Sequence, residues 1–224
     1  MSTLDRWVGI LRVITQQKPI FRIGMHSQPG RMITRDGIRF VSATEGHITE
    51  VPEYWMDDIR DECRVLDVGA NIGAFSLRAA RLSRHVVAVE PVTADLLREN
   101  IRENQASVRV IRAALGDGSP AVITWNGEVV TTPTFPLRDL VRMAGGCDLL
   151  KCDAEGAEWL IDPPDLGGIR RIEMELHQPP IGGPVNPALL AYIGREYTFT
   201  IDRIPAHGPL GQMGILHAWR EDQS

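Results

Sequence analysis

The sequence predicts an α/β domain in which helices cover both faces of a mostly parallel, seven-stranded β-sheet. From residue 64 onward, short apolar runs alternate with helical segments, which is the pattern of a parallel sheet. The last two strands are separated by the loop sequence PAHGPLG and not by a helix, so we expect them to be antiparallel to each other. The expected strands are 64–69, 85–90, 108–115, 147–153, 169–177, 197–204 and 211–220, and the expected helices are 74–82, 93–104 and 186–196.

The first 60 residues follow a different pattern and are predicted to form an N-terminal cap of a helix plus a β-hairpin. Apolar residues recur at helical spacing over residues 1–14, and this helix either packs on the domain or lies at a membrane surface or dimer interface. Asp36 and Gly37 form a turn signal between two strand-like runs. The predicted division is therefore a cap, residues 1–60, and one α/β domain, residues 61–224.

Composition limits the classes of partner and compartment. The 224 residues are 43% hydrophobic and 24% charged, with a net charge of −5, which is ordinary for a soluble globular protein and argues against a nucleic-acid partner. The three cysteines form no CxxC pair, which favours a reducing cytoplasm and no structural zinc. No run of residues is long enough to span a bilayer, and the charged N-terminus is not a secretory signal.

The run VLDVGANIGAFSL predicts a ligand pocket at the end of the first strand. The strand ends in Asp67, and the turn from Gly69 through Ala70 and Asn71 to Gly73 leads directly into a helix. Glycines permit a tight turn and close approach to a ligand, and a helix N-terminus favours a carboxylate or phosphate. Asn71 occupies the middle glycine of the dinucleotide fingerprint, which favours S-adenosylmethionine over NAD because an amino-acid carboxylate needs less room than a pyrophosphate.

The next two strands add candidate contacts for a nucleoside. Glu90 ends the second strand about 20 residues beyond the glycine turn, where a carboxylate accepts hydrogen bonds from ribose hydroxyls. Ala113 and Ala114 are small enough for an adenine ring to lie beside the third strand. Asp117 either binds the adenine amino group or belongs to a simple Gly-Asp-Gly turn.

An acidic cluster follows the fourth predicted strand. The run LLKCDAEGAEWLI places Asp153, Glu155 and Glu158 directly after a buried strand. In open parallel sheets, ligands bind at the carboxyl ends of the strands near the point where the strand order reverses. We expect the fourth strand to neighbour the first at this point, which would put Asp153 beside the reactive end of the cofactor.

Together these motifs resemble the FkbM family of S-adenosylmethionine-dependent methyltransferases. The resemblance covers residues 64 to 178 and depends on the combination of D-V-G-A-N-I-G with K-x-D-x-E-G-A-E, followed by IEMELH. It implies a Rossmann-like class I methyltransferase fold and transfer of a methyl group to a hydroxyl oxygen, typically on a sugar or a natural-product scaffold. The hydroxylated acceptor itself is not identified, and a homo-oligomer is possible.

Transfer to a hydroxyl requires in-line positioning and a base that removes the proton. His177 ends the fifth strand, and its ordinary pKa of about 6.5 suits this role, although a purely structural role is an equal alternative. Asp153 and Glu155 are the other candidates, and they would need raised pKa values. Glu175 points to the same side of the strand as His177 and could orient the imidazole.

Lys151 and a possible metal complete the predicted site. Lys151 lies inside an apolar strand, so we expect it to pair with Asp67, Asp153 or Glu155 and to hold the acidic cluster in place. A divalent cation such as magnesium is a second, less favoured interpretation of the cluster. Its ligands would come from Asp153, Glu155, Glu158, Glu175 and His177, although we expect Glu158 to face solvent on the following helix.

Three alternative functions, and the roles of three cap residues, are also considered. A tRNA or RNA base methyltransferase would share the glycine turn, but the sequence has no N-P-P-Y-type motif and no basic RNA-binding domain. An NAD dehydrogenase is disfavoured by Asn71 and by the lack of a second cofactor-binding half. A catalytically silent module would keep the cofactor pocket without transfer. His47, Tyr54 and Trp55 of the cap either reach the acceptor or only pack.

Overall fold

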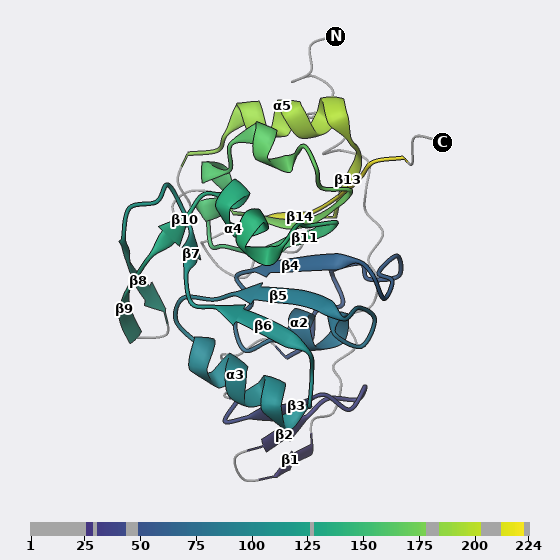
Figure 1. Ribbon diagram of the computed structural model, residues 1–224, viewed down its shortest axis with the longest axis vertical. Helices are drawn as coiled ribbons and strands as arrows, with labels where there is room; N and C mark the ends of the chain where they lie inside the picture. The colour runs from purple at the N-terminus through teal and green to yellow at the C-terminus, as the bar shows by residue number, and fades with distance from the viewer. Residues whose placement is uncertain are drawn as a thin grey trace.

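The computed structural model describes residues 26–28, 31–43, 49–125, 128–177, 184–202 and 212–221 (Figure 1). The predicted N-terminal helix, residues 1–14, and His47 lie outside these residues. Within the described part of the chain, no helix is long and apolar enough to cross a membrane. The three cysteines are buried and free.

The centre of the molecule is a seven-stranded sheet in the order β13-β14-β12-β11-β4-β5-β6. Strand β14 is antiparallel to both of its neighbours, and the other neighbouring strands are parallel to each other. The sheet and its antiparallel final pair are therefore as the sequence predicts. The strands are β4 (Arg64–Val68), β5 (His85–Val89), β6 (Val108–Ile111), β11 (Leu149–Cys152), β12 (Arg171–His177), β13 (Thr198–Asp202) and β14 (Gln212–Trp219).

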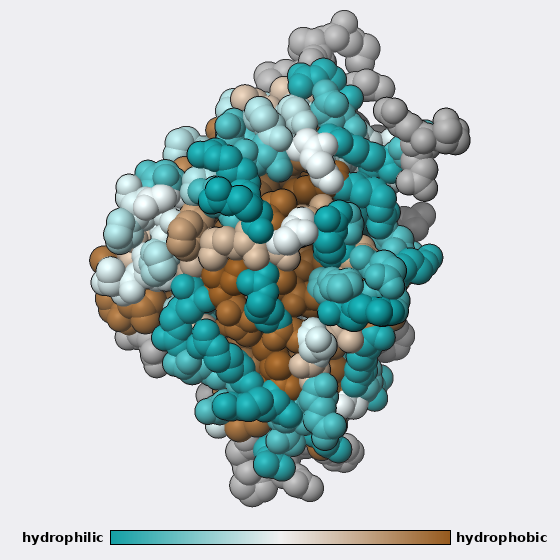
Figure 2. Space-filling model, in the orientation of Figure 1, coloured by the Kyte–Doolittle hydropathy of each residue, from teal (hydrophilic) through white to brown (hydrophobic). Residues whose placement is uncertain are grey.

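Helices cover both faces of this sheet because successive strand residues point to opposite sides. In β4, Val65 joins an apolar cluster with side chains of α2 (Ala74–Ala79). Its neighbour Leu66 joins a second cluster with side chains of α4 (Leu137–Ala144) and α5 (Pro187–Glu196). Figure 1 shows α2 behind the sheet and α4 in front of it. Figure 2 shows apolar side chains gathered on this front face between α3 (Ala94–Glu103) and α4, with polar residues around them.

Residues 114 to 144 contain elements that the sequence did not predict. The expected third strand, 108–115, divides into β6 and the two-residue strand β7 (Ala114–Leu115), which pairs with β10 (Thr134–Phe135) outside the main sheet. Between them, β8 (Ala121–Trp125) and β9 (Glu128–Thr132) form an antiparallel hairpin. These short elements pair only locally, so they carry little of the hydrophobic pattern that identifies the main strands.

The N-terminal region forms its own three-stranded antiparallel sheet of β1 (His26–Gln28), β2 (Arg31–Ile33) and β3 (Arg39–Val41). The predicted turn at Asp36–Gly37 joins β2 to β3, and Gly37 has a φ of +81°. Asn100 of α3 and Asn104, the residue that follows this helix, hold β3: Val41 N–H donates to Asn100 (2.7 Å), and Arg39 N–H donates to Asn104 (2.9 Å). The hairpin of the cap is thus confirmed, and the boundary at residues 60/61 stays a prediction.

Candidate active site

The candidate site lies at the carboxyl ends of β4 and β11. The two strands pair in parallel with Asp67 opposite Lys151. From β4 the chain continues to β5 and β6 on one side, whereas β12 and β14 lie beyond β11 on the other side. The strand order therefore reverses between β4 and β11, which confirms the predicted neighbour relation and is where ligands bind in such sheets.

The glycines of the turn after β4 serve contacts within the chain. Gly69 has a φ of +75°, and a Cβ atom there would lie 1.7 Å from the carbonyl oxygen of Asp153. Gly73 has a φ of +99°, and a Cβ atom there would lie 2.7 Å from Leu97 Cδ1. Backbone conformation favours glycine at both positions, and at Gly69 the backbone of Asp153 also excludes a side chain. The sequence analysis attributed these glycines to the close approach of a ligand, and that explanation stays a prediction.

Glu90 is held at the same edge by backbone donors. Its Oε2 accepts a hydrogen bond from Asn71 N–H (2.8 Å), and its Oε1 accepts from Val92 N–H (2.7 Å) and Thr93 N–H (3.0 Å). A carboxylate has about four acceptor positions, so one remains, on Oε2. Asn71 itself has a φ of +49°, and its Oδ1 is buried without a hydrogen bond among the described residues.

Lys151 is buried in an ion pair, as predicted. Its Nζ lies 3.2 Å from Asp67 Oδ1 and 3.6 Å from Asp153 Oδ2, and it donates to the carbonyl oxygen of Gly69 (2.8 Å). Ser76 donates to Asp67 Oδ2 (2.5 Å). Burial alone lowers the pKa of Lys151, but Asp67 and Asp153 outweigh it and raise the pKa above its usual value. Asp67 is fully buried. Because its carboxylate lies 3.2 Å from Lys151 Nζ, it stabilises the buried ammonium group.

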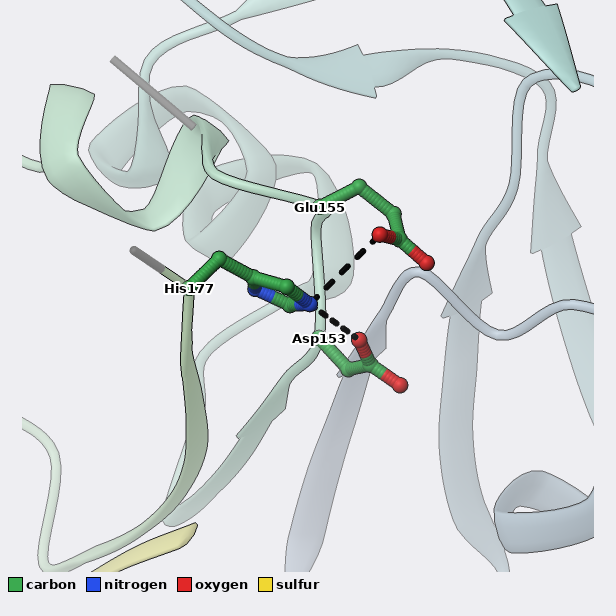
Figure 3. Close-up of side chains that lie close together, drawn as sticks. All are labelled: Asp153, Glu155 and His177. Carbon is green, nitrogen blue, oxygen red and sulfur yellow. Dashed lines mark ion pairs between the residues drawn. The ribbon is translucent and has the colours of Figure 1, made fainter. Parts of the chain in front are cut away.

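His177 lies at the centre of the acidic cluster (Figure 3). Its Nε2 is 3.5 Å from Glu155 Oε2 and 3.9 Å from Asp153 Oδ1. Glu175 Oε1 is also 3.9 Å from this nitrogen. The structure thus brings together His177, Asp153 and Glu155, the three residues that the sequence offers as bases, from the ends of β11 and β12.

Glu158 holds the imidazole, contrary to the prediction that it faces solvent. Glu158 Oε1 lies 3.1 Å from His177 Nδ1 and accepts the His177 backbone N–H at 2.7 Å. Its Oε2 accepts from Gly156 N–H (2.8 Å), and the side chain is fully buried. The segment is a 3₁₀ turn, η1 (Ala157–Leu160), that begins at a glycine with a φ of +99°. This tight turn directs residue 158 inward, whereas a regular solvent-exposed helix was expected.

Glu175 contacts the cap. It makes no hydrogen bond to the imidazole of His177, from which its Oε1 lies 3.9 Å away. Tyr54 Oη donates a hydrogen bond to Glu175 Oε2 (3.3 Å), and the Tyr54 ring lies 5.4 Å from Lys151 Nζ. Tyr54 therefore reaches the candidate site, a role that the sequence analysis left open against packing. Burial and, next, the charge of Asp153 raise the pKa of Glu175 to about 8.

The protonation of His177 restricts its predicted role as a base. Burial alone would lower its pKa, but the hydrogen bond and charge of Glu158 and the charge of Asp153 raise the pKa to about 9. In the unliganded protein at neutral pH, the ring therefore holds a proton and cannot accept another. His177 can act as the base only after a bound positive charge lowers this pKa.

Trp55 packs on the sheet beside the site. Its backbone N–H donates to Glu173 Oε2 (3.0 Å), and its ring stacks on His217 with centroids 3.9 Å apart. His217 Nδ1 lies 2.6 Å from the same Glu173 oxygen, and Arg171 pairs with Glu173 Oε1 at 2.6 Å. This buried network fixes the chain next to Tyr54, so Trp55 has the packing role.

The three predicted adenine contacts, Ala113, Ala114 and Asp117, lie after the end of β6, and Ala113 is fully buried. Ala114 is half-buried in β7. Asp117 is exposed, and its Oδ1 accepts a hydrogen bond from Ser119 N–H (2.8 Å). Gly118 has a φ of +101°, so the chain turns at the Gly-Asp-Gly sequence, and the contact of Asp117 with adenine stays a prediction.

A cavity of about 590 Å³ opens at the opposite edge of the sheet, at the amino ends of β4, β5 and β6. Two of its arginines are paired with carboxylates, Arg64 with Asp148 and Arg84 with Asp61, and Arg109 donates to the carbonyl oxygen of Met143. The cavity is thus remote from the residues brought together at the carboxyl edge, and we assign it no role.

Comparisons with solved structures identify the fold. A dimethyladenosine transferase from Plasmodium falciparum matches 78% of this chain and 64% of its own chain, with 10% identity and a TM-score of 0.51. The chain has a Rossmann-like class I methyltransferase fold. At this level of identity, the likeness concerns the fold alone.

Two further structures match with lower scores. Magnesium protoporphyrin IX methyltransferase from Synechocystis PCC 6803, with bound S-adenosylmethionine, shows 12% identity over 73% of this chain and 72% of its own, with a TM-score of 0.49. An rRNA methylase from Streptococcus thermophilus shows 11% identity over 73% of this chain and 90% of its own, with a TM-score of 0.48. No protein-family model matches the sequence, and no curated protein does.

Proposed function

We propose that the chain is an S-adenosylmethionine-dependent methyltransferase that methylates a hydroxyl group of a small molecule, a sugar or a natural product. The observation that carries the proposal is the buried Lys151–Asp67–Asp153 group at the reversal of strand order, directly beside the glycine turn and the acidic cluster. The fold supports a nucleoside cofactor at this edge. The hydroxyl acceptor follows from the resemblance to the FkbM family.

The cofactor is proposed to extend along the carboxyl edge from β11 to β6. The ribose would donate a hydrogen bond to Glu90 Oε2, which keeps a free acceptor position. The methionine part would lie over the turn at Gly69–Asn71, and the adenine beside Ala114 and Asp117. Asp153, next to Gly69, would then lie close to the sulfonium, whose positive charge its carboxylate stabilises.

The reaction needs few protein groups. The acceptor oxygen attacks the methyl carbon, a C–O bond forms as the S–C bond breaks, and S-adenosylhomocysteine leaves as a neutral thioether. The hydroxyl proton would pass to a carboxylate of Asp153 or Glu155, or to His177 once the bound sulfonium has lowered the pKa of its ring and the ring has lost its proton to solvent. We expect Tyr54 to contact the acceptor, because its hydroxyl reaches Glu175 from the cap side.

The charge of the cluster favours a neutral or cationic acceptor over RNA. The carboxylates of Asp153 and Glu155 lie beside His177, and the chain carries a net charge of −5. Nucleic-acid binding depends on cationic groups that neutralise phosphates. These observations support a small-molecule acceptor.

Cofactor binding provides the first test. We would titrate S-adenosylmethionine into the full chain by calorimetry, and repeat this with Glu90→Gln and with Glu99→Gln, an exposed change on α3. We expect saturable binding that Glu90→Gln weakens by about tenfold or more, because the glutamine amide replaces one strong acceptor oxygen. The control should bind like the unchanged chain. No binding of the cofactor by the unchanged chain would refute the proposed function.

A further inference from the structure

We propose that Asp153, Glu155 and His177 form a binding site for one divalent transition-metal cation. Each residue offers one ligand atom, and the three atoms lie within 4.8 Å of one another. Figure 3 shows the three side chains converging from two strand ends. A metal was the less favoured interpretation of the sequence, which placed Glu158 in solvent and offered Glu175 as the residue that orients His177.

The orientation of His177 is the observation that distinguishes this group from a chance cluster of acids. Only 2% of its side chain is exposed. Glu158 holds its Nδ1 and its backbone N–H, so the ring presents Nε2 to Asp153 and Glu155, with Glu175 also 3.9 Å away. In the part of the chain that the structure describes, this nitrogen makes no hydrogen bond. A histidine whose second nitrogen bonds a buried carboxylate is the usual arrangement of a metal ligand.

The distances fit a shared ion better than direct hydrogen bonds. The separations of 3.5 Å and 3.9 Å from Nε2 to the two carboxylates exceed the 2.7–2.9 Å or so of a charged N–H···O bond. Two ligands that each lie about 2.1 Å from one ion, at ordinary coordination angles, are about 3–4 Å apart. The gap between these atoms therefore has the size that a coordinated cation fills.

Lys151 does not occupy this gap. It lies on the other oxygen of Asp153, with Nζ 3.6 Å from Oδ2, whereas Oδ1 faces His177. Glu155 is the exposed member of the group, with 46% of its side chain accessible. An ion can thus enter from solvent past Glu155 and meet two deeper ligands.

The ligand set points to the class of ion. One imidazole nitrogen with two carboxylates suits Mn²⁺, Fe²⁺ or Zn²⁺, whereas Mg²⁺ prefers an all-oxygen shell. Three protein ligands leave coordination positions open. One consequence rests on the proposed function: an acceptor hydroxyl bound at an open position would have a lowered pKa. His177 would then be a ligand whose Nε2 has released its proton to solvent on metal binding, and this nitrogen would not serve as the base.

The test is binding of Mn²⁺ to the chelator-treated full chain, followed through the paramagnetic resonance signal of the free ion. We expect one saturable site per chain. Glu155→Gln should remove or strongly weaken this binding. The half-exposed Glu155 side chain makes no hydrogen bond among the described residues, so we expect the variant to fold normally. Glu158→Gln should weaken binding by about 10- to 100-fold through the loss of its support of His177. Glu99→Gln should bind as the unchanged chain does.

The outcomes separate this inference from the proposed function. The inference is overturned if Mn²⁺ shows no saturable binding, or if Glu155→Gln binds it as tightly as the unchanged chain. Binding of S-adenosylmethionine in excess chelator, together with either result, would keep the methyltransferase and discard the metal. Site-dependent Mn²⁺ binding without cofactor binding would support the metal site and refute the proposed function.

Discussion

Substitution of Gly69 by alanine tests how closely the glycine turn is pressed against the end of β11. The new Cβ would lie 1.7 Å from the carbonyl oxygen and 2.7 Å from the carbonyl carbon of Asp153, so the two segments would have to separate by more than ~1 Å to reach normal contact. The φ of +75° adds about 1–2 kcal/mol for a residue with a side chain. Overpacking costs about 1–3 kcal/mol, so we expect a total loss of about 2–5 kcal/mol.

Gly145→Ala is the matched control for this prediction. Gly145 also has a positive φ, +85°, but an added Cβ meets no atom within 4 Å, so only the backbone cost of about 1–2 kcal/mol applies. Urea denaturation gives the free energy of unfolding of both variants, and their difference isolates the clash. Gly69→Ala should also weaken cofactor binding, because Lys151 donates to the Gly69 carbonyl. Equal stability losses in the two variants would refute the reasoning.

Two further substitutions test the buried polar contacts. Lys151→Met leaves the fully buried Asp67 without its counter-charge, so we expect a loss of about 3–5 kcal/mol in urea denaturation. An unchanged unfolding midpoint together with an unchanged transfer rate would contradict the proposed role of Lys151. Tyr54→Phe removes one hydrogen bond to Glu175 and should cost about 1 kcal/mol in stability. Once an acceptor is known, it should also raise KM for that acceptor, and unchanged kinetics would show that Tyr54 only packs.

The central parallel strands β4, β5, β11 and β12 were predictable because they are buried on both faces. Runs such as VLDV and HVVAV are apolar and are followed by a glycine or a carboxylate, so their ends were placed within one or two residues of β4 and β5. The expectation that the fourth strand neighbours the first then followed from the general geometry of such sheets. The Lys151 ion pair was predictable for a different reason, the cost of burying an unpaired ammonium group.

The rest of the site depends on geometry that the sequence pattern does not contain. Glu158 was misplaced because a 3₁₀ turn that follows Gly156 changes the direction in which the side chain points. The contact between Tyr54 and Glu175 spans 121 residues and depends on how the Trp55 segment packs against β12. The hairpin β8–β9 went unpredicted because it pairs only with itself and exposes Val122 and Val129.

The most direct test of the account is transfer of labelled methyl groups from S-adenosylmethionine by the purified chain into fractionated cell extract. Asp153→Asn should be run beside it, because this change removes the charge that we place at the transfer site. We predict label in small hydroxylated metabolites, lipids or glycans with the unchanged chain, and at least tenfold less with the variant. Label that appears in RNA, or that Asp153→Asn leaves unchanged, would contradict a small-molecule methyltransferase with its site at this edge of the sheet.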